Sequence, residues 1–116
     1  MKKVVLLGST GSIGTSTCKV AKDLPDDIEL VGLAAGRNAG LLREQIKQFK
    51  PRAISLADAD AANELANEYD GKPEVFQGDE GLLELATLPE ADIVLIAIVG
   101  TAGLQPALAA IRAGKD

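Results

Sequence analysis

The stretch LLGSTGSIGTST, residues 6–17, places glycines at positions 8, 11 and 14, directly after an apolar run. That run, KVVLL at residues 3–7, is short and contains β-branched side chains, as is typical of strands covered on both faces. Apolar residues then recur at roughly helical spacing from Ser12 to Leu24. The stretch therefore predicts a strand, a tight glycine turn and a helix in immediate succession.

Further strands are expected along the rest of the chain. The apolar segments at residues 28–34 and 52–56 have the same character as the first strand. Residues 74–76 predict a short, weak strand at an edge of the sheet. Residues 93–99 form the longest apolar run, so we expect a central strand there, buried on both faces.

Helices are expected between these strands. Asn38 can cap a helix that Pro51 ends, and Asp58 can cap a second, alanine-rich helix. Two more helices are expected over residues 79–88 and 102–113. Strands and helices that alternate with short connections predict an α/β fold: a Rossmann-like, doubly wound and mostly parallel sheet in a single domain.

The composition excludes several classes of protein. The chain has 116 residues, net charge −5, only three aromatic residues, one cysteine and no histidine. It therefore lacks the basic surface and the stacking platform that nucleic-acid binding requires, so we expect no nucleic-acid partner. Disulfide frameworks, the usual zinc sites and histidine acid–base chemistry are excluded as well. No apolar run is long enough for a secretory core or a membrane span, and we expect a cytoplasmic protein without a membrane partner.

The glycine turn is typical of a phosphate-binding site. Free backbone N–H groups at a helix N-terminus donate to phosphate, and the helix dipole favours the negative charge. Gly8 would permit the tight turn, Gly11 would let the backbone approach a diphosphate, and Gly14 would let the helix pack close to the sheet. Thr10 and Ser12 can add hydroxyl hydrogen bonds. The spacing departs from G-x-G-x-x-G, so a purely structural turn is the alternative, but the flanking strand and helix favour cofactor binding.

The end of the second predicted strand indicates which dinucleotide binds. NAD-binding domains carry an acidic residue there, and this chain has none. Gly36 leaves space, the Arg37 guanidinium can pair with a phosphate, and Asn38 can donate from its side chain or from the next helix start. We therefore expect NADP in preference to NAD. The alternative for Arg37 is a solvated loop charge.

The remaining polar candidates have simpler explanations. Asp58, Asp60, Asp79 and Glu80 lie at predicted helix starts, where capping and the helix dipole explain acidic residues better than metal binding does. Cys18 lies among small and apolar residues of the first helix, so we expect it in the core. We assign no catalytic residue and no metal ligand to this chain.

Three segments together resemble one enzyme family. LLGSTGSIGTST, LAAGRN and AIVGTAGLQPALAAIRAGK are similar to successive segments of the NADPH-binding N-terminal domain of 1-deoxy-D-xylulose 5-phosphate reductoisomerases, and the match runs in order from Met1 to Lys115. The resemblance implies three groups of cofactor contacts. Thr10, Gly11, Ser12 and Ile13 would contact the diphosphate and adenosine ribose, and Gly36, Arg37 and Asn38 would contact the 2′-phosphate. The loop with Val99 and Gly100 would run beneath the nicotinamide half, and a close strand-to-helix turn without a cofactor contact is the alternative for this loop.

The resemblance also implies an activity. Family members rearrange 1-deoxy-D-xylulose 5-phosphate and reduce the product with NADPH to 2-C-methyl-D-erythritol 4-phosphate, for non-mevalonate isoprenoid biosynthesis. They are homodimers that use Mg²⁺ or Mn²⁺, and the metal ligands, the active-site lid and the substrate-phosphate site would lie beyond residue 116. We therefore expect residues 1–116 to be one domain of a longer oxidoreductase, inactive without its catalytic and C-terminal domains.

Alternatives remain open from the sequence. Gly114 fits a helix C-cap and the chain stops where another strand would begin, which favours a piece of a longer protein over a natural small domain. Another NADP-dependent reductase, such as a semialdehyde dehydrogenase or dihydrodipicolinate reductase, would share the glycine turn. A non-catalytic nucleotide-binding module would share it too.

Overall fold

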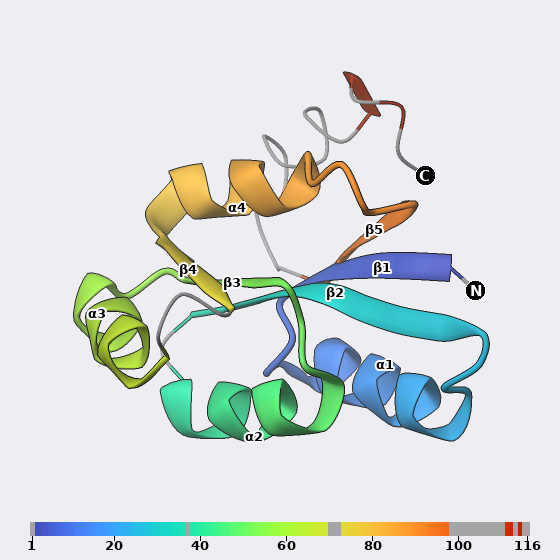
Figure 1. Cartoon of the computed structure of the whole chain (residues 1–116), viewed down its shortest axis with the longest axis horizontal. Helices are drawn as coiled ribbons and strands as arrows, with labels where there is room; N and C mark the ends of the chain where they lie inside the picture. The colour runs from blue at the N-terminus through green and yellow to red at the C-terminus, as the bar shows by residue number, and fades with distance from the viewer. Residues whose placement is uncertain (1, 37, 70–72, 98–110, 113, 115–116) are drawn as a thin grey trace.

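Strands and helices alternate along the chain in the computed structural model, which describes residues 2–36, 38–69, 73–97, 111–112 and 114 (Figure 1). In chain order these elements are β1 (Lys2–Leu7), α1 (Ser12–Asp23), β2 (Ile28–Ala35), α2 (Ala39–Phe49), β3 (Ala53–Leu56), α3 (Ala59–Glu68), β4 (Glu74–Gln77), α4 (Gly78–Ala86) and β5 (Ile93–Ile96). The predicted α/β class is therefore confirmed. No helix within the described ranges is long and apolar enough to cross a membrane.

The five strands form one parallel sheet in the order β4-β3-β2-β1-β5. From β1 the chain moves outward one strand at a time to β4, and α4 then carries it back so that β5 pairs with β1. In the register, Leu6 of β1 lies between Leu33 of β2 and Leu95 of β5. The strand order thus reverses at β1, and in such sheets ligands bind outside the carboxyl ends of the strands at this switch point.

Helices cover both faces of the sheet. Figure 1 shows α1 and α2 below the sheet and α4 above it. The lower core contains Leu6 and Leu33 together with Leu42 of α2 and Leu65 of α3, and the upper core contains Leu85 of α4. Successive residues of a strand point to opposite faces, so β1 contributes to both cores. Val5, Leu6 and Leu7 are accordingly completely buried, as the apolar run at residues 3–7 predicts.

Local signals set the helix boundaries. The Asn38 side chain accepts a hydrogen bond from the Leu41 amide at 3.1 Å, and the Asp58 side chain accepts one from the Asp60 amide at 3.0 Å. Both predicted caps are therefore confirmed. The helix expected over 79–88 runs over Gly78–Ala86. Of the helix expected over 102–113, only residues 111–112 are described, and they are helical.

The prediction that residues 93–99 form a central, doubly buried strand is wrong. Within the described sheet β5 is an edge strand that pairs with β1 alone, and Leu95 is 37% exposed. The Ala97 amide continues the ladder to Leu7 O at 2.8 Å, while residues 98 and 99 lie outside the described part. The length of an apolar run indicates how much apolar surface a strand can bury. The position of the strand in the sheet depends instead on the crossover through α4. The prediction of β4 as an edge strand is confirmed.

Candidate dinucleotide-binding site

The turn between β1 and α1 is pinned to the end of β2. The amides of Gly8 and Ser9 both donate to Ala34 O at 2.8 Å. Gly8 has φ 94°, in the left-handed region where glycine is favoured, and its carbonyl accepts from the Gly11 amide at 3.3 Å. The tight-turn geometry predicted for Gly8 is therefore present at the carboxyl end of β1.

The amino end of α1 is open. The N-cap residue is Gly11, with φ −79°, and it has no side chain that could accept a hydrogen bond from the first amides of the helix. The first turn of α1 also contains no acidic residue. Within the described part of the chain, no backbone oxygen accepts from the amides of Ser12, Ile13 or Gly14. The helix α4 also begins without a side-chain cap, but at the β4 edge of the sheet. Among the described helices α1 to α4, α1 alone combines an open amino end with the switch point, where an anion gains several donors and the helix dipole at once.

The three site glycines differ in what the surrounding chain demands. A Cβ on Gly14 would overlap the carbonyl oxygen of Gly8, so Gly14 allows close packing of α1 against the turn itself, rather than against the sheet as the sequence suggested. A Cβ on Gly11 would meet Gly8 O at an ordinary 3.7 Å, and one on Gly36 would meet no atom of the described residues within 4 Å. Neither Gly11 nor Gly36 has a positive φ. The packing of the chain therefore leaves both free for close approach by a ligand.

The second half of the candidate site follows β2. Gly36 and Asn38 are exposed directly after the strand, beside the turn that Ala34 O holds. The Asn38 side-chain oxygen caps α2, which leaves its NH₂ group as a donor, and the first turn of α2 has no acidic residue. Segment 8–14 thus lies at the same edge of the sheet as Gly36 and Asn38. Arg37, Val99 and Gly100 lie outside the described residues.

Thr10 and Ile13 complete the predicted diphosphate contacts. Thr10 is half-buried, and Ile13 is 64% exposed although it is a large apolar residue. Among the residues that the structure describes, no packed side chains therefore fill the corner where α1 begins, as an anion site requires. The binding role of these residues stays a prediction.

The sequence alone indicates no role for Gln45 or Ser9. Gln45 is 5% exposed on the inner side of α2, and its Nε2 donates to Ser9 O at 2.8 Å. Ser9 is completely buried within the turn. The available signal was a glutamine in the apolar stripe that also contains Leu42 and Ile46, because polar residues on a buried helix face need a hydrogen-bond partner.

Two of the remaining polar candidates, Asp58 and Cys18, have the structural roles that the sequence predicts. Asp58 caps α3, as described above, and Cys18 is buried in the lower core, where desolvation raises the pKa of its thiol above the ordinary value of 9.0. Within the described ranges, no three His, Cys, Asp or Glu side chains are grouped so that they could hold a metal ion.

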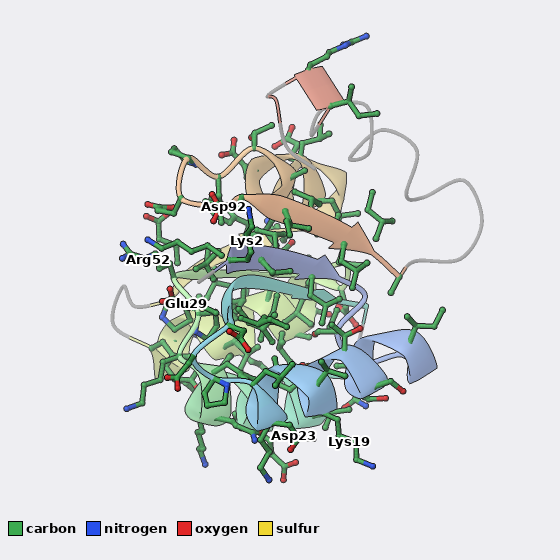
Figure 2. All side chains as sticks on the ribbon, turned by 90° about the vertical axis from the view of Figure 1, so that its right-hand side faces the viewer. Lys2, Lys19, Asp23, Glu29, Arg52 and Asp92 are labelled. Carbon is green, nitrogen blue, oxygen red and sulfur yellow. The ribbon has the colours of Figure 1, made fainter. Side chains whose placement is uncertain are left out.

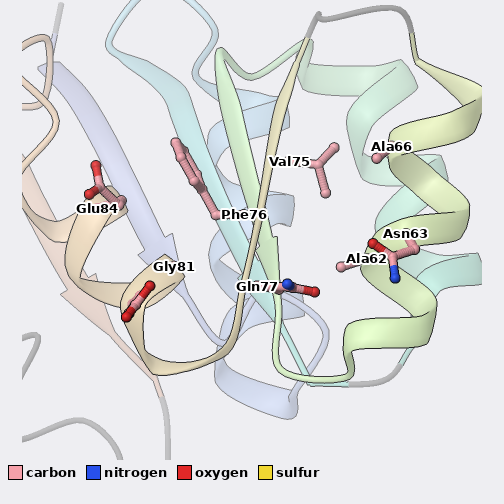
Figure 3. Close-up of a pocket in the computed structure, with 9 residues that line it drawn as sticks. Ala62, Asn63, Ala66, Val75, Phe76, Gln77, Gly81 and Glu84 are labelled. Atoms are coloured by element: carbon pink, nitrogen blue, oxygen red, sulfur yellow. The ribbon is translucent and has the colours of Figure 1, made fainter.

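Two hollows lie away from the glycine turn. One, of about 300 Å³, flanks the edge strand β4, where Val75 points toward α3 and Phe76 toward α4 (Figure 3). The other, of about 890 Å³, lies at the amino ends of the strands and includes Arg52. Figure 2 shows charged side chains, Lys2, Glu29, Arg52 and Asp92, together at that edge. The candidate site lies at the opposite edge, where the strands have their carboxyl ends. Residues 8–14, which form part of it, include no charged side chain.

The parallel sheet, its switch point and the open first helix define the Rossmann-like class of α/β domains, in which dinucleotides bind at this corner. A family model described as 1-deoxy-D-xylulose 5-phosphate reductoisomerase matches residues 4–116. The chain belongs to the 1-deoxy-D-xylulose 5-phosphate reductoisomerase family.

Relatives and solved structures agree with this assignment. The chain is 50% identical over its whole length to the 1-deoxy-D-xylulose 5-phosphate reductoisomerase of Geobacter metallireducens, and 45% identical over 99% of its length to that of a Geobacillus species. The Zymomonas mobilis enzyme in complex with NADPH matches 98% of the chain with a TM-score of 0.88 at 36% identity. A reductoisomerase complex with NADPH, fosmidomycin and magnesium matches 99% with a TM-score of 0.91 at 34% identity. The chain spans about 30% of the length of these proteins.

Proposed function

We propose that this chain is the NADPH-binding domain of an enzyme that converts 1-deoxy-D-xylulose 5-phosphate to 2-C-methyl-D-erythritol 4-phosphate in non-mevalonate isoprenoid biosynthesis. The observation that carries the proposal is the open amino end of α1 behind the glycine turn, at the switch point of the sheet. The solved family members with bound NADPH support the choice of cofactor. NADPH supplies the hydride for the reduction.

The residues of the first turn bind the diphosphate in this proposal. Backbone amides from Thr10 to Ile13 donate to its oxygens, and the absence of a side chain at Gly11 permits close approach. Thr10 and Ser12 add hydroxyl donors. Gly14 lets α1 pack against the turn so that its first amides lie at the carboxyl edge of β1.

The segment after β2 holds the 2′-phosphate. Arg37 pairs with the phosphate, Asn38 donates from its free NH₂ group, and Gly36 leaves room for both. These residues select NADPH over NADH because only NADPH carries that phosphate. Val99 and Gly100 line the nicotinamide half.

The rest of the enzyme supplies the reaction chemistry. We assign no catalytic residue and no metal ligand to residues 1–116, and place the Mg²⁺ or Mn²⁺ site in the remaining part of a cytoplasmic homodimer. The chain alone is then inactive. The magnesium in solved family members supports a metal in the full-length enzyme, and the family match favours this function over another reductase or a non-catalytic module.

Substitution of Arg37 tests the proposal. In the full-length protein, Arg37→Ala is expected to weaken NADPH binding about tenfold or more and to leave NADH binding unchanged, because a charge-assisted pair to phosphate is lost. Fluorescence titration with both cofactors measures this. Arg52→Ala is the matched control, since Arg52 is exposed at the opposite edge of the sheet. Equal affinities of the unsubstituted protein for NADPH and NADH would contradict the assigned 2′-phosphate site.

A further inference from the structure

Gln45 makes a long-range side-chain hydrogen bond to the glycine turn. It reaches the turn from α2, 36 positions along the chain, and its Nε2 donates to Ser9 O at 2.8 Å. Both residues are buried, at 5% and 0% exposure. The contact therefore lies behind the turn, on the side facing α2 and away from solvent.

This hydrogen bond sets the direction of the next amide. In a planar trans peptide the C=O and N–H groups point in opposite directions. Because Ser9 O points inward to Gln45, the N–H of Thr10 points away from α2. No backbone oxygen in the described chain accepts from that amide. Gln45 thus holds Thr10 N–H as a free donor on the outer side of the turn.

The other hydrogen bonds of the turn do not fix the orientation of the peptide group between Ser9 and Thr10. Gly8 and Ser9 donate to Ala34 O, and Gly11 donates to Gly8 O, but none of these bonds involves the carbonyl of Ser9 or the amide of Thr10. Without Gln45, Ser9 O would be a buried acceptor with no partner, and rotation of the peptide would relieve it. The bond from Gln45 is what opposes that rotation.

Packing alone does not explain why position 45 carries a glutamine. Gln45 lies between Leu42 and Ile46 on the buried face of α2. Its Oε1, like the Ser9 Oγ, is buried and has no hydrogen-bond partner among the described residues. An unpartnered buried oxygen is unfavourable, and an apolar residue of similar length would avoid it. The contact to Ser9 O is the compensating interaction.

We propose that Gln45 is a positioning residue for cofactor binding, which orients the Ser9–Thr10 peptide so that the Thr10 amide donates to the diphosphate. This role rests on the proposed function of the turn. The helix that carries Gln45 also begins at Asn38, so α2 positions both the diphosphate turn and the 2′-phosphate segment.

Gln45→Met in the full-length protein removes the donor and keeps the length of the side chain. We expect affinity for NADPH and NADH to fall by the same factor, about threefold to tenfold, because both cofactors carry the diphosphate. Arg37→Ala, in contrast, affects NADPH alone. The KM for NADPH should rise while kcat changes little. Gln48→Met on the exposed side of α2 is the matched control and should change none of these values.

Gln45→Glu provides a conservative variant and a second readout. The protonated acid can donate to Ser9 O, whereas the carboxylate cannot. Relative to the unsubstituted protein at the same pH, NADP⁺ affinity of Gln45→Glu should therefore recover as the pH falls, and that of Gln45→Met should not. This recovery distinguishes a lost donor from a general packing defect.

The outcomes separate the two proposals. If the unsubstituted protein binds NADPH and Gln45→Met binds it equally well, or if Gln45→Glu shows no recovery at low pH, the role of Gln45 is overturned and the proposed function stands. If the unsubstituted protein binds neither cofactor, the proposed function fails and the role of Gln45 fails with it.

Discussion

At the scale of single residues, the glycines of one motif have different physical roles. Gly8 adopts a positive φ, and Gly14 has no space for a Cβ because the carbonyl of Gly8 lies against it. Gly11 has neither constraint, since its φ is −79° and a Cβ would have room. The fold therefore explains Gly8 and Gly14, whereas the described structure places no such demand on Gly11, and close approach of a ligand is its proposed role.

Alanine substitutions should separate these roles. Gly14→Ala is expected to lower the free energy of unfolding by about 1–3 kcal/mol, because the new Cβ forces backbone atoms apart. Gly11→Ala should lower it by only about 0.5 kcal/mol, since alanine is a poorer N-cap than glycine, yet it should weaken NADPH and NADH binding alike. Urea unfolding and cofactor titration measure the two effects. A Gly11→Ala protein with unchanged cofactor affinity would show that no ligand approaches this position.

At the scale of elements, helices that begin at the same edge of the sheet differ in how their amino ends are capped. α2 and α3 are capped by Asn38 and Asp58, whereas α1 begins at Gly11 with no side-chain cap through it. A capping side chain accepts a hydrogen bond from one of the first amides of the helix. Without a cap, these amides stay available as donors to a ligand. This contrast fits a structural role for Asp58 and a binding role for the amino end of α1.

The capping role of Asp58 predicts an effect on stability alone. Asp58→Ala should lower the free energy of unfolding by about 1 kcal/mol, through loss of the bond to the Asp60 amide. Asp58→Asn should have a much smaller effect, because asparagine is an equally good N-cap. Thermal or urea unfolding provides the measurement. If Asp58→Ala instead changed the metal requirement of the full-length enzyme at unchanged stability, Asp58 would be a ligand and not a cap.

At the scale of the whole molecule, two cores enclose β1 and β2, and Cys18 lies in the lower core. The reactivity of its thiol therefore measures how well that core is closed to solvent. The thiol is 7% exposed between α1 and the sheet, and burial raises its pKa. Reaction of a thiol requires both access and the thiolate form, so both effects slow it. Labelling of Cys18 is therefore expected to be slow while the protein stays folded.

We expect Cys18 to react with an aromatic disulfide reagent much more slowly in the folded protein than in urea. The raised pKa also gives a direction to the pH dependence of folding. The neutral thiol contributes its full stability below pH 9.0, the ordinary value, and this contribution decreases as the pH rises toward the pKa of the folded state. The stability difference between the unsubstituted protein and Cys18→Ala should thus narrow above pH 9.0. Rapid labelling of the folded protein at neutral pH would contradict the burial of Cys18.

Local chemistry explains why much of the fold could be predicted. The cap at Asn38, the turn at Gly8 and the alternation of strands and helices depend on residues within a few positions of one another, and the structure has all three. Candidate residues 8–14 and the pair Gly36 and Asn38 could be chosen for the same reason. A helix that follows a parallel strand must begin at that strand's carboxyl end.

The sequence by itself determined the fold class, the helix caps and the position of the glycine turn, because each follows from short-range backbone and side-chain preferences. Only the tertiary structure decided that β5 lies at an edge of the described sheet and that Gln45 contacts Ser9. Both depend on how segments distant in the chain pack against each other. An apolar or polar residue type constrains whether a group is buried, whereas the crossovers and helix docking determine which neighbour it meets.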